Sequence, residues 1–337
     1  MTGRMRGITL AAGALACVTA PTASAQDANG YADVEIREWD VPYANSRPRD
    51  PYVGPDGRVW FVGQRTHYIA SFDPETGEFE RFPLEDGVGP HNLIVGEDGA
   101  IWYAGNRAMH IGLLDPETGA IEKIMMPDSS ARDPHTLVFS GDDHIWFTLQ
   151  GSNKVGRLTR STREVELLDV PTPAARPYGI VVDPQGRPWI AQLGTDRLGT
   201  VDPETMTYEE IALPREAARL RRLQRTSDGA IWYVDYAEGY LGRYDPESGE
   251  FREWRAPGAA QSGPYAMAVD DRDRLWFVET RQDPNRLVGF DPATERFFAA
   301  EAVPSGAGSV RHMVFHAPTR TIWFGTDANT LGRALVP

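Results

Sequence analysis

The stretch GPHNLIVGEDGAIWYAG, residues 89–105, returns forty-four residues later as DPHTLVFSGDDHIWFTL, residues 133–149. Each copy contains a proline, a histidine, an apolar run, a Gly/Asp turn and an aromatic run with a tryptophan. This tryptophan occurs seven times along the chain, at spacings of 42 to 47 residues: Trp60, Trp102, Trp146, Trp189, Trp232, Trp276 and Trp323. A period in the low forties is typical of β-propellers, in which each repeat forms one four-stranded blade.

Turn residues within each repeat indicate short strands. PDG, EDG and SDG separate apolar runs, and DPETG at 73–77 and 115–119 places Pro early and Gly where φ turns positive. Only residues 215–225 look helical, and their place in the repeat assigns them to the entry and first strand of the fifth blade. We therefore predict an all-β fold, a seven-bladed β-propeller with four antiparallel strands per blade.

The last repeat supplies only three strands, the third within NTLGRALV at 329–336. Its fourth strand is expected from the N-terminal segment VEIREWDV, residues 34–41, because the pattern of this segment matches the other outer strands. Such a closure removes the exposed sheet edges. The seven repeat tryptophans are then expected to pack one blade against the next.

The first 25 residues differ from the rest of the 337-residue chain. Arg4 and Arg6 precede an uncharged stretch at 7–20, and ASA at 23–25 offers the small residues of a signal-peptidase site. We predict a signal peptide at 1–25, a single propeller domain at 26–337 and a periplasmic or secreted location. The only cysteine, Cys17, lies in the signal, so the mature chain has no cysteine chemistry.

Charge and motifs narrow the function classes. Loss of Arg4 and Arg6 changes the net charge from −14 to −16, which argues against a nucleic-acid binder. No later apolar run is long enough to span a membrane. No glycine-rich loop opens a helix, and no organic cofactor is expected. No G-x-S-x-G elbow for a serine nucleophile occurs either. We expect a monomer.

The strongest functional candidate is a ring at the start of the first strands, eleven residues before each repeat tryptophan. These positions should meet around the central channel: Arg49, His91, His135, Tyr178, Arg221, Tyr265 and His312. Packing alone would accept Ser, Val or Ala there, whereas all seven are large and polar or ionisable. The alternative is structural, because channel mouths are wet and tolerate polar residues. Four histidines lie outside the ring by register and are interpreted as structural or surface residues: His67, His110, His144 and His316.

Arginines are expected on the same rim, in the connectors that lead to the first strands: Arg47, Arg132, Arg176, Arg215, Arg219, Arg222 and Arg311. Local positive charge in an acidic protein indicates a small anionic ligand, although solvated surface arginine is an equal alternative for each one. The second strands return to this mouth with Asn106, Gln150, Gln192, Asp235, Glu279 and Asp327. Their carboxylates could orient a histidine, hold Mg²⁺ or Ca²⁺, or pair with the arginines.

The repeat resembles the streptogramin B lyase (virginiamycin B lyase) family of seven-bladed propellers over essentially the whole mature chain. The resemblance is carried by IREWDVP at 36–42, DGRVWF at 56–61, NKVGRL at 153–158 and RPYGI at 176–180. It implies a lyase that opens a cyclic depsipeptide at an ester by Mg²⁺-assisted elimination. Family lyases carry PH in one blade, E-P-H in the next and P-Y-G nearby.

The family's site pattern can be placed on this chain in two ways. Read in register from the N-terminus, only His312 and Asp327 match, since Tyr265 and Val310 replace a histidine and a glutamate. Rotated by three blades, the pattern returns in three consecutive blades: His91 in GPH, Asp133 and His135 in DPH, and Tyr178 in RPYG. The resemblance then implies a metal ligand at Asp133, with Asp327 as the in-register candidate. Gln150 stands where a second glutamate would help to hold Mg²⁺.

Three functional hypotheses follow. The first is a carbon–oxygen lyase acting on an ester or ether of an anionic substrate. His91 or His135 is its general base, the other His or Tyr178 is its acid, and His312 is a further catalytic candidate. Substrate contacts are expected from Arg49, Arg221, Tyr265, Arg132 and Arg311. The alternatives are a lactonase- or esterase-type hydrolase and a non-catalytic periplasmic binding propeller for an anionic ligand.

Overall fold

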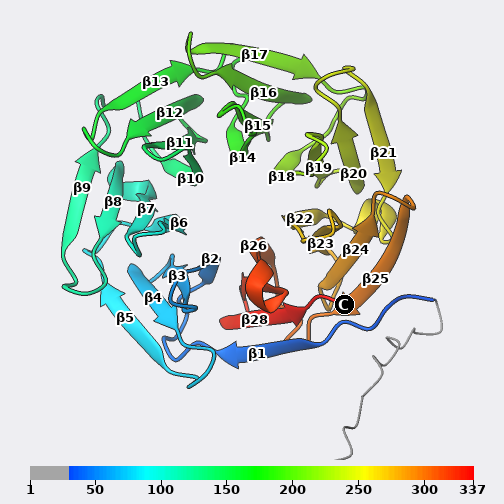
Figure 1. Ribbon diagram of the computed structural model, residues 1–337, viewed down its shortest axis with the longest axis horizontal. Helices are drawn as coiled ribbons and strands as arrows, with labels where there is room; N and C mark the ends of the chain where they lie inside the picture. The colour runs from blue at the N-terminus through cyan, green and yellow to red at the C-terminus, as the bar shows by residue number, and fades with distance from the viewer. Residues whose placement is uncertain (1–29) are drawn as a thin grey trace, which may run out of the picture.

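The computed structural model describes residues 30–337, so the predicted signal peptide at 1–25 lies outside the described residues. Seven four-stranded sheets are arranged in a ring about a central axis (Figure 1), which confirms the predicted seven-bladed propeller. We call the space between their first strands the channel. Strands within each blade are antiparallel and follow one another outward from the channel, apart from the blade that closes the ring. Within residues 30–337, no helix is long and apolar enough to cross a membrane.

The strands fall into four concentric sets. The first strands, which line the channel, are β2 (Pro48–Val53), β6 (Pro90–Val95), β10 (Pro134–Ser140), β14 (Pro177–Val182), β18 (Leu220–Arg225), β22 (Pro264–Val269) and β26 (Val310–His316). The second strands are β3 (Val59–Gly63), β7 (Ile101–Gly105), β11 (His144–Leu149), β15 (Pro188–Gln192), β19 (Ile231–Asp235), β23 (Leu275–Glu279) and β27 (Thr321–Thr326). The third strands are β4 (Tyr68–Phe72), β8 (His110–Leu114), β12 (Lys154–Thr159), β16 (Arg197–Asp202), β20 (Tyr240–Tyr244), β24 (Arg286–Asp291) and β28 (Thr330–Leu335). The outer strands are β5 (Phe79–Pro83), β9 (Ile121–Met125), β13 (Val165–Asp169), β17 (Thr207–Ala212), β21 (Phe251–Arg255), β25 (Arg296–Ala302) and β1 (Ile36–Asp40). Three short 3₁₀ helices lie in connecting turns: η1 (Asn106–Ala108), η2 (Ala259–Gln261) and η3 (Ala317–Thr319).

Local pattern and fold conflict in the segment at 215–225. Its arginines and leucines favour a helix in isolation, yet residues 220–225 form the strand β18, as the repeat predicts. Tertiary context therefore overrides local helix propensity at this position.

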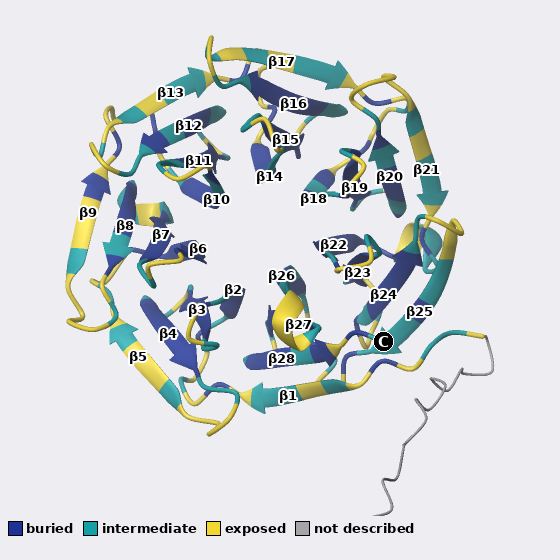
Figure 2. Ribbon diagram, in the orientation of Figure 1, coloured by how far each residue is buried: buried dark blue, intermediate teal, exposed yellow. Residues whose placement is uncertain are grey.

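Inner strands are buried, whereas the outer strands alternate between half-buried and exposed residues (Figure 2).

The tryptophans hold neighbouring blades together. Each of the seven is at most 5% exposed and packs in an apolar cluster with residues of the next blade. Trp102, for example, shares a cluster with Leu137 and Ile145 of the third blade. Trp323 of the last blade packs with Val59 and Phe61 of the first, so the series closes on itself.

Ring closure joins the two ends of the chain. β1 pairs antiparallel with β28, with Ile36 opposite Ala334 and Asp40 opposite Thr330, as the sequence predicts. Asn329 reinforces this joint through four hydrogen bonds. Its amide nitrogen donates to the carbonyl oxygens of Val41 (2.9 Å) and Tyr43 (3.2 Å), and its amide oxygen accepts from the backbone N–H and hydroxyl of Ser46 (2.9 and 3.0 Å).

Asn153 makes a similar set of bonds between two blades that are adjacent in sequence. Its amide nitrogen donates to the carbonyl oxygens of Val170 and Thr172, and its oxygen accepts from the N–H of Arg176. Both asparagines adopt a positive φ, 56° for Asn153 and 70° for Asn329. Asn153 is thus a natural control for Asn329, because it has the same local chemistry without joining the chain ends.

We predict that Asn329→Ala lowers the free energy of unfolding by about 1–3 kcal/mol, since it removes several hydrogen bonds in a half-buried setting. Asn153→Ala should lower it by a similar amount. Only Asn329→Ala should speed amide hydrogen exchange in residues 36–40, because only Asn329 fixes the segment that follows β1. Unchanged exchange there would show that the β1–β28 ladder closes the ring without Asn329.

Candidate functional site

The site begins with a bulge at the start of every first strand. In β10, Pro134 pairs with Leu149, but the next paired residue is Leu137, so His135 and Thr136 lie outside the ladder. The same interruption follows the first residue of five other first strands. In β2 it lies one residue later, so Arg49 stays paired with Val62 and Asp50 leaves the ladder. A bulge frees consecutive residues from the pleat, so that both can turn to the channel. Each blade therefore contributes to two layers, the predicted ring and the residues after it: Asp50, Asn92, Thr136, Gly179, Arg222 and Ala266.

The last blade differs by one residue, because Met313 is paired with Phe324 and the unpaired residues are Arg311 and His312. Arg311 therefore takes the ring position there, and His312, which the sequence placed in the ring, belongs to the second layer.

The predicted ring residues of three consecutive blades are in direct contact. The ring centroids of His91 and His135 are 3.6 Å apart, and those of His135 and Tyr178 are 4.3 Å apart. The Tyr178 hydroxyl in turn hydrogen-bonds the Tyr265 hydroxyl of the sixth blade. Residues separated by as many as 174 positions thus form one continuous cluster at the channel, as the repeat register predicts.

Hydrogen bonds give the two imidazoles different proton positions. His91 Nδ1 lies 3.1 Å from the carbonyl oxygen of His135, which can only accept, so Nδ1 carries the proton and Nε2 holds the lone pair. His135 Nδ1 lies 2.8 Å from the hydroxyl of Thr136, which accepts from Arg222 at 3.0 Å. Because that hydroxyl can then donate to His135 Nδ1, the His135 proton is assigned to Nε2. His91 Nε2 is an acceptor and His135 Nε2 a donor.

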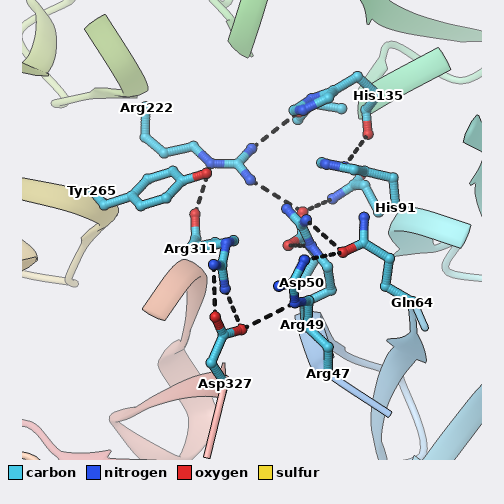
Figure 3. Close-up of polar contacts among 12 residues, drawn as sticks. Arg47, Arg49, Asp50, Gln64, His91, His135, Arg222, Tyr265, Arg311 and Asp327 are labelled. Carbon is cyan, nitrogen blue, oxygen red and sulfur yellow. Dashed lines mark hydrogen bonds and ion pairs between the residues drawn. The ribbon is translucent and has the colours of Figure 1, made fainter. Parts of the chain in front are cut away.

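Beneath the ring, Asp50 is the centre of a buried ionic layer (Figure 3). Its carboxylate accepts from Arg49 Nε at 2.8 Å, from Arg222 Nη2 at 3.1 Å and from Asn92 Nδ2 at 3.1 Å. Arg222 crosses the channel and also donates from Nε to the carbonyl oxygen of Arg311 at 3.0 Å. Asp50 takes a φ of 48°, a left-handed conformation that Asp tolerates better than most residues.

This layer contains more positive than negative charge. Arg49, Asp50 and Arg222 are all buried, so two guanidinium groups share a single carboxylate. Burial would raise the pKa of Asp50, but Arg49 and Arg222 outweigh that effect and hold the pKa well below its usual range. The carboxylate is ionised at neutral pH, and one buried positive charge remains uncompensated.

The histidines are neutral because of the same surroundings. Burial, reinforced by the guanidinium groups of Arg49 and Arg222, holds the pKa of His91 well below 6.5. Burial, His91 and Arg222 do the same for the pKa of His135. Burial and Arg222 lower the pKa of His312 to about 4. The three imidazoles are therefore uncharged at neutral pH.

The two tyrosines have opposite pKa shifts. Burial opposes ionisation of Tyr178, but Arg222, Arg49 and Arg221 together lower its pKa. Burial and the neighbouring Tyr178 raise the pKa of Tyr265. Arg221 lies over the rings of Tyr178 and Tyr265, with its guanidinium carbon 5.3 and 4.6 Å from their centroids. Tyr178 is thus the more acidic member of this hydrogen-bonded pair.

Of the remaining predicted substrate arginines, Arg311 stands at the ring position of the last blade and Arg132 lies in a connector. Arg311 forms a bidentate ion pair with Asp327, whose Oδ1 is also 3.3 Å from Arg47 Nε. Arg132 is exposed, and its backbone N–H donates to Ser152. Asp235 and Glu279, at the ends of β19 and β23, likewise pair with arginines. Of the alternatives for the second-strand carboxylates, the structure therefore has ion pairing with arginine.

The candidate metal ligands are occupied by other partners. Asp133 Oδ2 accepts from the N–H of Gly151 at 2.5 Å and Oδ1 from the hydroxyl of Ser152 at 3.0 Å. Asp327 is engaged by Arg311 and Arg47. Over residues 30–337, no three His, Cys, Asp or Glu side chains are grouped as a metal site. This donor set does not fit Mg²⁺, so a magnesium cofactor stays a prediction from resemblance.

The sequence-based ring omitted Asp50, Asn92 and Thr136, and the sequence placed Arg222 in a connector on the rim. Their signal was present one residue beyond the ring, where four of seven positions are polar. A regular strand would point these side chains away from the channel, because successive residues face opposite sides of a sheet. The bulge reverses that expectation.

We predict that Asp50→Asn lowers the free energy of unfolding by about 3–5 kcal/mol, since it leaves two buried guanidinium groups without a carboxylate. Glu80→Gln is the matched control, because it removes an exposed partner of Arg58 at 3.0 Å and should change stability by less than about 1 kcal/mol. Urea unfolding of both variants measures the difference. Equal effects would contradict a charge-dependent layer.

Several solved protein structures have a similar architecture. Virginiamycin B lyase from Staphylococcus aureus superposes with a TM-score of 0.82 at 20% identity, covering 90% of this chain and 100% of the other. A streptogramin B lyase structure gives 0.81 at 22% identity, covering 89% and 97%. Hydrazine synthase from Kuenenia stuttgartiensis gives 0.72 at 14% identity, covering 88% and 97%. These likenesses show a shared fold.

No curated protein matches the sequence. The model of the virginiamycin B lyase family, however, matches residues 7–287, which is most of the chain. Together with the seven-bladed fold, this match shows that the chain belongs to the virginiamycin B lyase family.

Proposed function

We propose that this protein is a carbon–oxygen lyase that acts, after export to the periplasm or beyond, on an ester or ether of a small anionic substrate. The observation that carries the proposal is the contact of neutral His91, neutral His135 and acidic Tyr178 beside uncompensated guanidinium groups. Family membership supports the reaction class, and the excess positive charge supports an anionic substrate.

Two unsatisfied donors indicate where the anion binds. Arg49 Nη2 and Arg221 Nε are buried and have no hydrogen-bond partner. A buried guanidinium N–H without an acceptor is costly, so an incoming carboxylate, phosphate or sulfate gains both hydrogen bonds and charge compensation. Both arginines lie near Tyr178, which supports an anion-binding position next to the acid–base groups.

The proton positions assign the catalytic roles. His91 Nε2 removes the proton from the carbon next to a carbonyl group, and the electron pair of that C–H bond forms the new C=C bond. The C–O bond at the next carbon breaks, and its electron pair leaves with the oxygen, which takes a proton from Tyr178. His135 Nε2–H and Arg49 stabilise the enolate oxygen as it develops, a role that a neutral imidazole can fill.

The low pKa of His91 makes it a weak base in the free protein. An anion bound by Arg49 and Arg221 offsets the positive charge that, with burial, lowers this pKa. Substrate binding should therefore raise the basicity of His91 when it is needed. A neutral substrate analogue would not have this effect, so the mechanism selects for anionic substrates at the chemical step as well as at binding.

A second candidate is binding without turnover, and the burial of the ring favours it. His91, His135, Tyr178 and Tyr265 are each at most 6% exposed, and they pack against one another. A substrate can reach His91 only if these side chains move apart. Hydrolysis is a third option, since His91 Nε2 could activate water in place of removing a C–H proton.

We predict that His91→Ala lowers kcat by at least about a hundredfold while the affinity for the anion stays within about threefold. Arg221→Gln should weaken binding about tenfold. β-Acyloxy and β-alkoxy carboxylates and quinupristin serve as substrates, and the ultraviolet absorption of a conjugated alkene reports elimination. Titration calorimetry with sulfate and with the same carboxylates reports affinity.

His67→Ala is the control, because His67 lies outside the ring and accepts a hydrogen bond from the N–H of Gly89. Saturable binding without turnover on any substrate would support the binding-only function. Product that contains oxygen from labelled water, with no alkene formed, would support hydrolysis instead of elimination.

We predict that stability falls as the pH drops from about 6.5 toward about 4. His312 has a folded pKa of about 4 and an unfolded pKa of about 6.5, so the unfolded chain binds more protons across this window. The free energy of unfolding therefore rises with pH there, by at most about 1.4 kcal/mol per pH unit for each such histidine. His312→Gln should reduce the slope measured by urea unfolding, and an unchanged slope would contradict a neutral buried His312.

A further inference from the structure

The channel contains a cavity on the other side of Arg222 from the histidine ring. Its volume is about 420 Å³, and its walls come from the first strands of all seven blades. The ring residues stand at the beginning of these strands, whereas most of the cavity walls come from residues two to four positions later. The cavity therefore lies toward the opposite face of the propeller from the candidate active site.

The cavity is polar at one end and apolar elsewhere. Asn92, Thr136, Arg222 and His312 line it where it meets the buried ionic layer. Beyond them, the walls are mainly aliphatic and aromatic, with Val138, Val181, Val269 and Phe315 among them. The amide of Gln224 is an exception, and its nitrogen donates to the carbonyl oxygen of Met267 at 3.1 Å. An apolar cavity of this size with a few convergent polar groups is typical of a small-molecule site.

Two observations at the polar end indicate an anionic group. His312 Nδ1 is buried and has no hydrogen-bond partner. Arg222 donates three hydrogen bonds, while a guanidinium has five N–H groups, so two remain for a ligand. The layer around Asp50 also carries one uncompensated positive charge. A carboxylate satisfies all three conditions, because it accepts from both residues and carries the missing negative charge.

We propose that this cavity binds a small amphipathic carboxylate, such as a medium-chain fatty-acid anion. Its carboxylate lies against Arg222 and His312, and its hydrocarbon chain lies between the valine and phenylalanine side chains. The site is separate from the one under Proposed function, since Arg222 and its partners divide the channel between them. It can therefore exist whether or not the histidine ring is catalytic.

The test is titration calorimetry of the full-length protein with octanoate and with octanol. Octanoate should bind saturably and at least about tenfold more tightly than octanol, because only octanoate accepts charge-assisted hydrogen bonds. Val181→Trp and, independently, Val138→Trp should each weaken octanoate binding by at least about tenfold by filling the cavity. Val53→Trp is the matched control, since Val53 is half-buried in a first strand but does not line this cavity, and it should change affinity by less than about twofold.

His312→Phe tests the polar end with little change of shape. It should reduce the preference for octanoate over octanol and leave octanol binding unchanged. Arg221→Gln, which alters the ring mouth alone, should leave octanoate binding unchanged, so failure of the proposed enzyme and failure of this site are distinguishable. Absence of saturable octanoate binding, equal affinity for octanol, or loss of binding in Arg221→Gln would each overturn the proposal.

Discussion

The centre of this propeller depends on the ion pairs and hydrogen bonds that the carboxylate of Asp50 makes. It is the only acidic group among the fourteen residues of the two channel layers, and it meets Arg49, Asn92 and Arg222 from three different blades. Without it, two guanidinium groups would share the buried channel with no counter-charge. With it, Arg222 can cross the channel, fix Thr136 and set the proton position of His135. The Asp50 carboxylate therefore both fixes the side chains at the channel axis and determines where His135 carries its proton.

The same charge arrangement explains why the buried histidines are uncharged at neutral pH and why the pKa values of Tyr178 and Tyr265 shift in opposite directions. Burial and the guanidinium groups lower the pKa of the histidines, and the guanidinium groups make Tyr178 a stronger acid than Tyr265. The proposed base, His91, and the proposed acid, Tyr178, come from the second and fourth blades, and His135 of the third blade lies between them. The bulges make this possible, because identical backbone modules can present different side chains to one point.

The sequence was sufficient for the architecture and for half of the site. The period of the tryptophans predicts seven blades, and the pattern of residues 34–41 predicts the strand that closes them, because both depend on hydrophobic spacing alone. The ring from Arg49 to Tyr265 follows from the same register, whereas the last blade is offset by one residue, so that Arg311 stands where His312 was predicted. The second layer could not be found that way, since a β-bulge changes side-chain direction without changing the spacing between repeats. The position of Asp133, which caps a loop at Gly151, depends on local backbone geometry that the motif DPH does not specify.

Closure by β1 also has a consequence for biogenesis. Blades one to six are contiguous in sequence and can each form as soon as their own residues are available. Blade seven cannot, because residues 36–40 must wait for residues 330–335 before they have a pairing partner. The paired residues are about 290 to 300 positions apart in the chain, and contacts of such large sequence separation are slow to form. A chain that crosses a membrane unfolded would therefore become a closed ring only at its destination, after its final segment has emerged.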